Sequence, residues 1–255
     1  MAAITATPEK LDVGRVFQGT FGVISRNFTT FLVLSLLFGA LPSVLTTVAA
    51  GGRTGQAFSL DWLGRFGIGW LVALVSNSVL QGALVHATVS DLDGRRASVS
   101  ECLRTGLNHF LPLILAGFLY GLLFVGGLAL FVVPGIIALV TWCVVSPVVV
   151  VERTGVLGAL GRASALTKGS RWRIFGLMLI YAIFVGAVQS ALISMLGGLS
   201  AIRLGAAISP GYVAVTVLVS LIGAILGSAG IAVLYSELRR VRDGVGARDL
   251  ASVFD

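Results

Sequence analysis

The chain has 255 residues, of which 56% are hydrophobic and 11% are charged, a charged share about half of that in soluble domains. This composition excludes a soluble globular domain and indicates a protein of the lipid bilayer. The net charge of +7 does not indicate nucleic acid as a partner, because the basic residues lie in short segments between long uncharged stretches.

Six stretches are long and apolar enough to cross a membrane. A span needs about 20 mostly apolar residues, since only a helix satisfies its own backbone polar groups in hydrocarbon. The longest uncharged stretch, Thr105 to Val151, has 47 residues, so we expect it to reverse at Val133-Pro134-Gly135 and to supply two spans. The predicted spans are 28–50, 66–89, 111–132, 135–151, 174–197 and 211–235.

An amphipathic pattern precedes the first, third and fifth spans. Apolar residues at 13, 16, 17, 20, 21 and 24 share one helical face, and the same spacing returns at 99–110 and 156–167. This arrangement predicts three interfacial amphipathic helices and a pseudo-threefold internal repeat. It leaves open whether these helices enter the lipid headgroups or pack on the bundle. The predicted fold is therefore an all-α integral membrane protein with one domain over residues 1–255 and flexible tails at 1–10 and 243–255.

The basic residues are distributed unequally between the two sides of the membrane. With six spans, fifteen of the 18 Lys and Arg residues fall on the side that carries both termini. The positive-inside rule then predicts a multi-pass protein of the bacterial cytoplasmic (inner) membrane with both termini in the cytoplasm. Basic side chains at this surface attract anionic headgroups. The candidate lipid headgroup contacts are Arg95, Arg96, Arg104, Arg171, Trp172 and Arg173.

Two further groups of polar residues are candidates for a role. Glu152 follows the fourth span, and an ion pair with Arg162 or Lys168 would make a structural clamp across the following loop. Candidate members of an intramembrane polar face are Ser76, Asn77, Gln81 and Gln189. Because amides avoid lipid, we expect Asn77 and Gln81, one turn apart, to face the bundle. They would either join helices by hydrogen bonds or line a transport path.

Glycine and proline residues add two expectations about helix packing. Gly117-x-x-x-Gly121 and Gly223-x-x-x-Gly227 permit close approach of helices, either within the bundle or between copies in a homo-oligomer. Pro147, inside the fourth span, should bend or break the hydrogen bonding of its helix.

The sequence lacks the convergent polar groups that catalysis requires. No carboxylate lies at the centre of a predicted span, and neither His86 nor His109 has a carboxylate at metal-ligand spacing. We expect no catalytic site, no metal and no cofactor. A lipid-processing enzyme would have to assemble its ionisable groups from Glu152, Asp91, Asp93, His86 and His109.

One segment has a distinctive motif. It contains Val132-Val133-Pro134-Gly135-Ile136-Ile137, Trp142, Pro147, Glu152, Gly155, Ala159-Leu160, Arg162, Leu166-Thr167-Lys168-Gly169 and Trp172. Across 131–177 the chain resembles the YciC-like family, also described as the membrane domain of glycerophosphodiester phosphodiesterases, although Ala163 stands where that family often has Ser. The resemblance implies a six-helix inner-membrane protein whose role is largely undefined. It does not imply phosphodiesterase activity, because the chain has no room for the catalytic barrel.

Together these patterns predict a non-enzymatic membrane protein that interacts with lipid or organises the membrane at the cytoplasmic leaflet. The alternative is a small transporter or channel with a polar path near Asn77 and Gln81. The predicted partners are membrane lipids, and the sequence names no protein partner.

Overall fold

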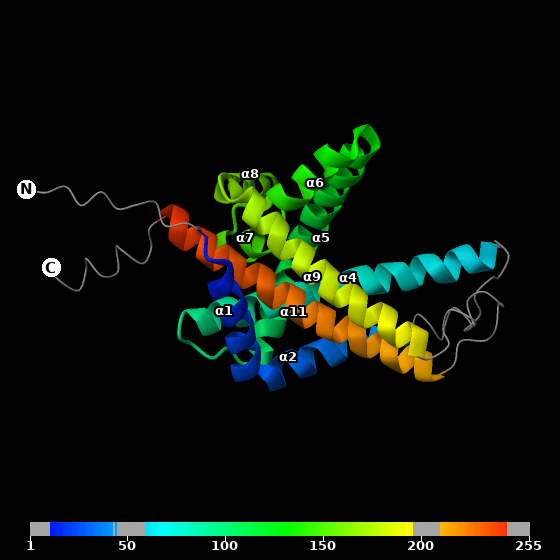
Figure 1. Ribbon diagram of the computed structural model, residues 1–255. Helices are drawn as coiled ribbons and strands as arrows, with labels where there is room; N and C mark the ends of the chain where they lie inside the picture. Colours follow the sequence, from blue (N-terminus) through cyan, green and yellow to red (C-terminus); the bar gives the residue numbers. More distant parts are fainter. Residues whose placement is uncertain (1–10, 43, 45–59, 196–209, 244–255) are drawn as a thin grey trace, which may run out of the picture.

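The computed structural model describes residues 11–42, 44, 60–195 and 210–243, and the regular structure in these ranges is entirely helical (Figure 1). The predicted tail at 1–10 lies outside the described residues, as do 244–255. The predicted C-terminal tail begins one residue too early, because Asp243 is the last residue of a helix. The helices are α1 (Val13–Arg26), α2 (Phe28–Ser35), the π-helical turn η1 (Leu36–Ala40), α4 (Leu60–Leu92), α5 (Val99–Leu130), α6 (Val132–Thr141), α7 (Val145–Glu152), α8 (Gly155–Thr167), α9 (Arg171–Met195) and α11 (Pro210–Asp243).

Local side-chain bonds fix where two of these helices begin. The Asp12 carboxylate accepts hydrogen bonds from the backbone N–H groups of Gly14 and Arg15, at 2.9 and 3.3 Å, and so caps α1. Ser98 Oγ accepts from the N–H of Glu101 at 3.2 Å and caps α5. Each bond satisfies a backbone donor that has no partner within its own helix.

Five described helices are long and apolar enough to cross a membrane, and they correspond to the second to sixth predicted spans. A sixth crossing is present if α1 and the α2–η1 segment, which meet at an angle of 81°, are counted together. The first predicted span, 28–50, lies only partly within the described residues. The described part of the chain therefore contains five to six helices able to span a membrane.

The three amphipathic segments do not all form separate helices. Residues 13–24 lie in α1 and 156–167 in α8, each flanked by a break. Residues 99–110, however, are the first turns of α5, which continues to Leu130. The expectation of a separate second helix is wrong, because α5 continues through Pro112 without a break.

The turn between α5 and α6 lies slightly earlier than predicted. The chain reverses at Phe131, whose backbone is extended, and Pro134 belongs to the first turn of α6. A proline is tolerated there because the N–H groups of a first turn have no intrahelical acceptor. A Cβ on Gly127 would lie 2.9 Å from the Cα of Gly135, so two glycines permit the close return of the chain.

The fourth span is broken in the middle. α6 ends at Thr141 and α7 begins at Val145, although both belong to the apolar segment Val132–Glu152. Pro147 accounts for the break: in a continuous helix its ring would clash with the carbonyl of Cys143, four residues earlier. Because α7 begins only at Val145, Cys143 precedes the helix and this clash does not arise.

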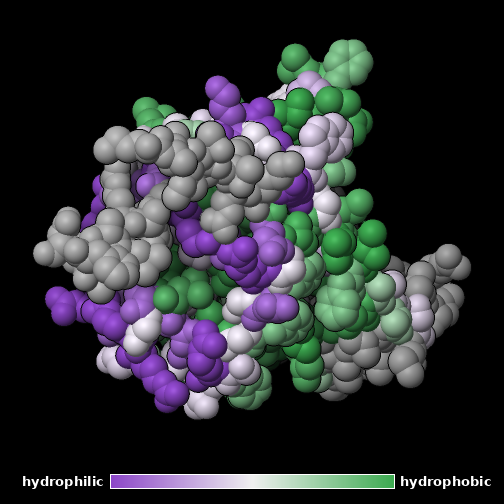
Figure 2. Space-filling model, turned by 60° about the vertical axis from the view of Figure 1, so that its left-hand side comes forward, coloured by the Kyte–Doolittle hydropathy of each residue, from purple (hydrophilic) through white to green (hydrophobic). Residues whose placement is uncertain are grey.

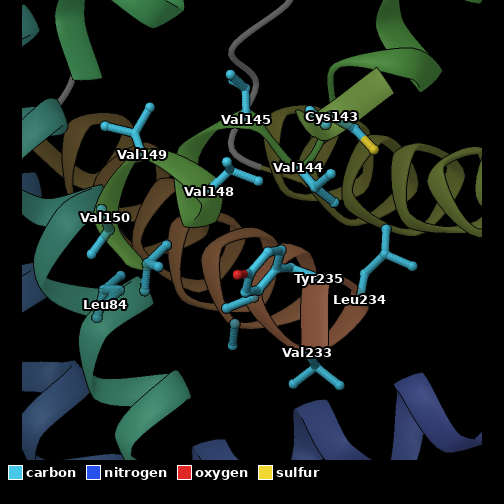
Figure 3. Close-up of a cluster of buried hydrophobic side chains, with 14 of the residues drawn as sticks. Leu84, Cys143, Val144, Val145, Val148, Val149, Val150, Val233, Leu234 and Tyr235 are labelled. Atoms are coloured by element: carbon cyan, nitrogen blue, oxygen red, sulfur yellow. The ribbon is translucent and has the colours of Figure 1, made fainter. Parts of the chain in front are cut away.

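α7 forms the centre of the core. Its residues from Val145 to Val150 are all buried, and they pack with Leu84 of α4 and Tyr235 of α11 (Figure 3). Away from this centre the outer parts of α4, the α5–α6 hairpin and the α9–α11 pair extend in different directions (Figure 1). Their exposed side chains are largely apolar, as expected of surfaces that face lipid.

The two glycine motifs differ in their surroundings. A Cβ on Gly227 would lie 2.8 Å from Tyr181 Oη, and the same hydroxyl donates to the carbonyl of Gly223 at 2.7 Å. The space beside the glycine motif of α11 is therefore occupied by Tyr181 of α9, a helix of the same chain. A Cβ on Gly117 or Gly121 would meet nothing within 4 Å.

Candidate functional site

Glu152 lies in a cluster of polar side chains where α7, α8 and α11 meet. Arg162 Nε donates to both of its carboxylate oxygens, at 3.0 and 3.1 Å, and Tyr235 Oη donates to one of them at 2.9 Å. Arg153 adopts a left-handed conformation with φ 51°, followed by Gly155 at φ 74°. This tight turn leads the chain from α7 into α8 and places Arg162 beside Glu152.

The cluster extends to the end of α11. Arg162 Nη2 donates to Asp243 Oδ2, which also lies 3.9 Å from Arg239 Nε. Hydrogen bonding to Asp243, with a smaller contribution from Glu152, raises the pKa of the Arg162 guanidinium against the effect of burial. One arginine on α8 thus joins a carboxylate from α7 to another from α11. We define Glu152, Arg162, Tyr235 and Asp243 as the α8 clasp.

The structure brings together two of the three residues predicted as a clamp. Lys168 does not contribute its ammonium group to Glu152; its backbone carbonyl instead accepts a hydrogen bond from Arg242. The sequence does not predict two members of the clasp: Asp243, which falls in the predicted tail at 243–255, and Tyr235, which lies in an apolar span. Arg239 and Asp243 are one helical turn apart, a spacing at which opposite charges stabilise a helix. This spacing is the sequence signal that α11 extends to Asp243.

A second ion pair joins α1 to α4. Arg26 Nη2 lies 2.6 Å from Asp91 Oδ2, and Asn27 Nδ2 donates to Asp91 Oδ1 at 2.7 Å. Only 5% of the Asp91 side chain is exposed, so these donors supply the hydrogen bonds that water would otherwise give its carboxylate. The contact lies at the 81° bend between α1 and α2 and fixes it against α4.

The candidate headgroup contacts are exposed. They comprise Arg95, Arg96, Arg104, Arg171, Trp172 and Arg173. Trp172 is 86% exposed, and Arg173 also donates to the backbone carbonyl of Leu11 at 2.9 Å. Hydrophilic side chains gather at this end of the molecule, and hydrophobic ones cover the parts that extend away from it (Figure 2).

The amphipathic helices α1 and α8 pack on the bundle. α1 buries Val16 and Val23 and contacts α11, and α8 buries Ala159 and Leu166. Each nevertheless leaves a large apolar side chain exposed. Phe21 is 58% exposed and Leu157 is 76% exposed.

The residues of the predicted polar face do not come together. Gln81 is partly buried, and its Nε2 donates to Ser146 Oγ of α7 at 2.9 Å. Asn77 and Gln189 are exposed, and Ser76 is partly exposed. Asn77 does not face the bundle as expected, because helix packing around α4 begins only near Ser78, in the half of α4 that reaches the core.

Gln81 lies on the wall of a cavity of about 230 Å³ beside the break between α6 and α7. Tyr120, Trp142 and Ser146 also line it. The Tyr120 hydroxyl donates to the carbonyl of Leu139 at 3.4 Å, and Trp142 Nε1 donates to the carbonyl of Leu160 at 3.2 Å. Gln81 is ten residues from Asp91 along α4, which corresponds to about 15 Å at 1.5 Å per residue. The cavity therefore lies about 15 Å along α4 from the Arg26–Asp91 ion pair.

The ionisable groups considered for catalysis are in separate places. His86 Nε2 lies 3.3 Å from Glu101 Oε1, and His109 Nδ1 contacts the carbonyl of Thr105 at 2.9 Å. Within the described ranges, no group of three His, Cys, Asp or Glu side chains could hold a metal ion.

No protein-family model, curated protein or solved structure matches this chain. The function proposed for it therefore depends on the geometry of its own residues.

Proposed function

We propose that this chain is a non-enzymatic, multi-pass protein of the bacterial cytoplasmic membrane that binds anionic lipid headgroups at the cytoplasmic leaflet. The observation that carries the proposal is the group of exposed arginines, with Trp172, at the end of the bundle where α1 and α8 pack. Each arginine near an anionic surface contributes about 1 kcal/mol. A tryptophan beside arginines is the side-chain combination typical of a membrane interface.

The apolar side chains that α1 and α8 leave exposed support the same proposal. Phe21 lies on α1 and Leu157 on α8, and both side chains are largely exposed. Large apolar groups on an otherwise polar surface are stabilised when they enter the boundary between headgroups and acyl chains. In this arrangement the two helices pack on the bundle with one side and meet lipid with another.

The test is native mass spectrometry of the protein released from its own membrane. The wild type is compared with a variant in which Arg95, Arg96 and Arg104 are all changed to Gln. The matched control changes the same three residues to Lys and so keeps the charge. We expect an anionic lipid to be retained by the wild type and the Lys variant and lost from the Gln variant. Equal retention by all three proteins would refute the proposal.

A second candidate function is transport of a small solute, and the broken span favours it. Discontinuous helices beside a polar cavity at mid-bilayer are typical of secondary transporters, and the break between Thr141 and Val145 lies beside Gln81. Substitution of Gln81 by Leu should then abolish solute flux in proteoliposomes, whereas Asn77→Leu, at an exposed position, should not. Unchanged flux in Gln81→Leu would count against transport through this cavity.

A further inference from the structure

A second cavity, of about 250 Å³, lies beside the polar one. It is a groove formed by α9 and α11 together with residues of α1. Its lining includes Thr20 and Phe21 of α1, Leu177 and Phe184 of α9, and Gly230 and Leu234 of α11. Nearly all of these side chains are apolar. We refer to it as the α9–α11 groove.

The groove and the polar cavity have three wall residues in common: Cys143, Met178 and Ile231. These three side chains therefore border both spaces. A methionine at such a boundary adapts its shape easily, since its side chain is unbranched and has three rotatable bonds. A single elongated molecule could thus occupy both spaces.

The walls determine the chemistry of that molecule. The residues that line the two spaces include no Asp, Glu, Lys, Arg or His. An ionised headgroup at this depth would lack a counter-charge, which is costly in a medium of low dielectric constant. The groove is suited to a hydrocarbon chain, and the cavity to a polar but uncharged head.

Gln81 supplies the groups that would recognise the head. A side-chain amide has two N–H donors and one carbonyl acceptor, and Gln81 gives one donor to Ser146. The same amide also offers an acceptor to a ligand hydroxyl and a second donor to a ligand carbonyl. Ser146 and Tyr120 lie on the same cavity wall.

We propose that the polar cavity and the α9–α11 groove together bind an uncharged amphiphile with one hydrocarbon chain and a hydroxyl or carbonyl head. The head contacts Gln81 and Ser146, and the chain lies between α9 and α11. This site is separate from the arginines of the headgroup surface, and its ligand is neutral rather than anionic. The two proposals can therefore fail independently.

Trp142 provides a direct measurement, because it lies on the wall of the polar cavity. With Trp62, Trp70 and Trp172 changed to Phe, Trp142 remains as the sole tryptophan. The probe is a monoacylglycerol with a brominated acyl chain, since bromine quenches tryptophan fluorescence at short range. We expect saturable quenching by this probe and weaker, unsaturated quenching by the brominated fatty acid anion of the same length. Equal quenching by both probes, or quenching that rises linearly, would overturn the proposal.

Two substitutions in this protein test the head and the chain separately. Gln81→Leu should weaken probe binding by about 3- to 30-fold, as the loss of hydrogen bonds worth about 0.6 to 2 kcal/mol implies. Gly230→Leu places a side chain in the groove and should abolish saturable quenching. A Cβ at Gly230 would make only an ordinary contact, 3.9 Å from Thr20 Oγ1, so the change begins from unstrained geometry.

The control for the groove is Gly176→Leu, at a position of α9 where a Cβ would meet nothing within 4 Å. It adds the same side chain outside the groove and should leave quenching unchanged. Thermal melting of each variant shows whether the fold is kept. If Gly230→Leu and Gly176→Leu bind the probe equally well, the chain does not occupy the groove and the proposal is overturned. The variant that lacks Arg95, Arg96 and Arg104 should bind the probe as the wild type does.

Discussion

Removal of the charge of Glu152 tests whether the α8 clasp stabilises the bundle. In Glu152→Gln the side chain keeps its size and can still accept the hydrogen bond from Tyr235, but it loses its ionic interaction with Arg162. The side chains of Glu152 and Arg162 are 16% and 32% exposed. Their pair thus lies between exposed pairs, worth about 0 to 1 kcal/mol, and buried pairs, whose disruption costs about 3 to 5 kcal/mol.

We therefore expect Glu152→Gln to destabilise the protein by about 2 kcal/mol. At about 2 to 4 °C per kcal/mol for a chain of this size, the melting temperature in detergent should fall by about 4 to 8 °C. Arg162→Gln should cost more, because it removes the guanidinium that Glu152 and Asp243 share. Asp93→Asn, which removes an exposed negative charge, is the control and should change the melting temperature little.

A double-mutant cycle separates a direct interaction from two independent effects. If Glu152 and Arg162 interact, the double variant should be more stable than the sum of the two single losses implies, by about 1 to 2 kcal/mol. Fully additive losses would refute the clasp as a direct interaction, even if each single variant were destabilised.

Three other substitutions have defined outcomes, each measured by thermal melting. Gly106→Ala should destabilise the protein by about 1 to 3 kcal/mol, because the new Cβ would collide with a backbone carbonyl of α4. Gly117→Ala, whose Cβ meets no neighbour, is the control and should be neutral or stabilising. Equal effects of the two substitutions would show that the close approach of α4 and α5 at Gly106 is not required. Asp91→Ala should destabilise the protein by about 1.5 to 3 kcal/mol, since it removes the hydrogen bonds that the carboxylate accepts from Arg26 and Asn27. Asp93→Ala is the control and should cost little. Similar losses of stability in both variants would show that the Arg26–Asp91 pair does not stabilise the fold. Tyr181→Phe should cost about 0.5 to 1.5 kcal/mol through one lost hydrogen bond, and an unchanged melting temperature would mean that this bond adds no net stability.

The helical class and the approximate limits of most spans could be predicted from the sequence, because the bilayer imposes a minimum length of apolar chain. The predicted chain reversal differs from the observed one by about one turn. A proline such as Pro134 is as well suited to the first turn of a helix as to a loop, so its presence does not distinguish the two. The second amphipathic segment could not be recognised as part of a longer helix, because periodicity shows which face is apolar and does not show where a helix ends.

The candidate site was predictable only where its members are close in sequence. Glu152 and Arg162 are ten residues apart, and their pairing depends on a tight turn between two helices. Asp243 lies 81 residues beyond Arg162, and its approach depends on how α11 crosses the bundle. The sequence places Asn77 and Gln81 on one face of α4. It does not show which half of α4 reaches the core, because that depends on the helices that pack against α4.

The separation of Arg162 and Asp243 has a consequence for how the protein is made. A polypeptide leaves the ribosome from its N-terminus, so Arg162 emerges long before the carboxylate that completes its surroundings. The contact with Asp243 can form only after α9 and α11 have been synthesised. Closure of this end of the bundle is therefore a late step in the assembly of the protein.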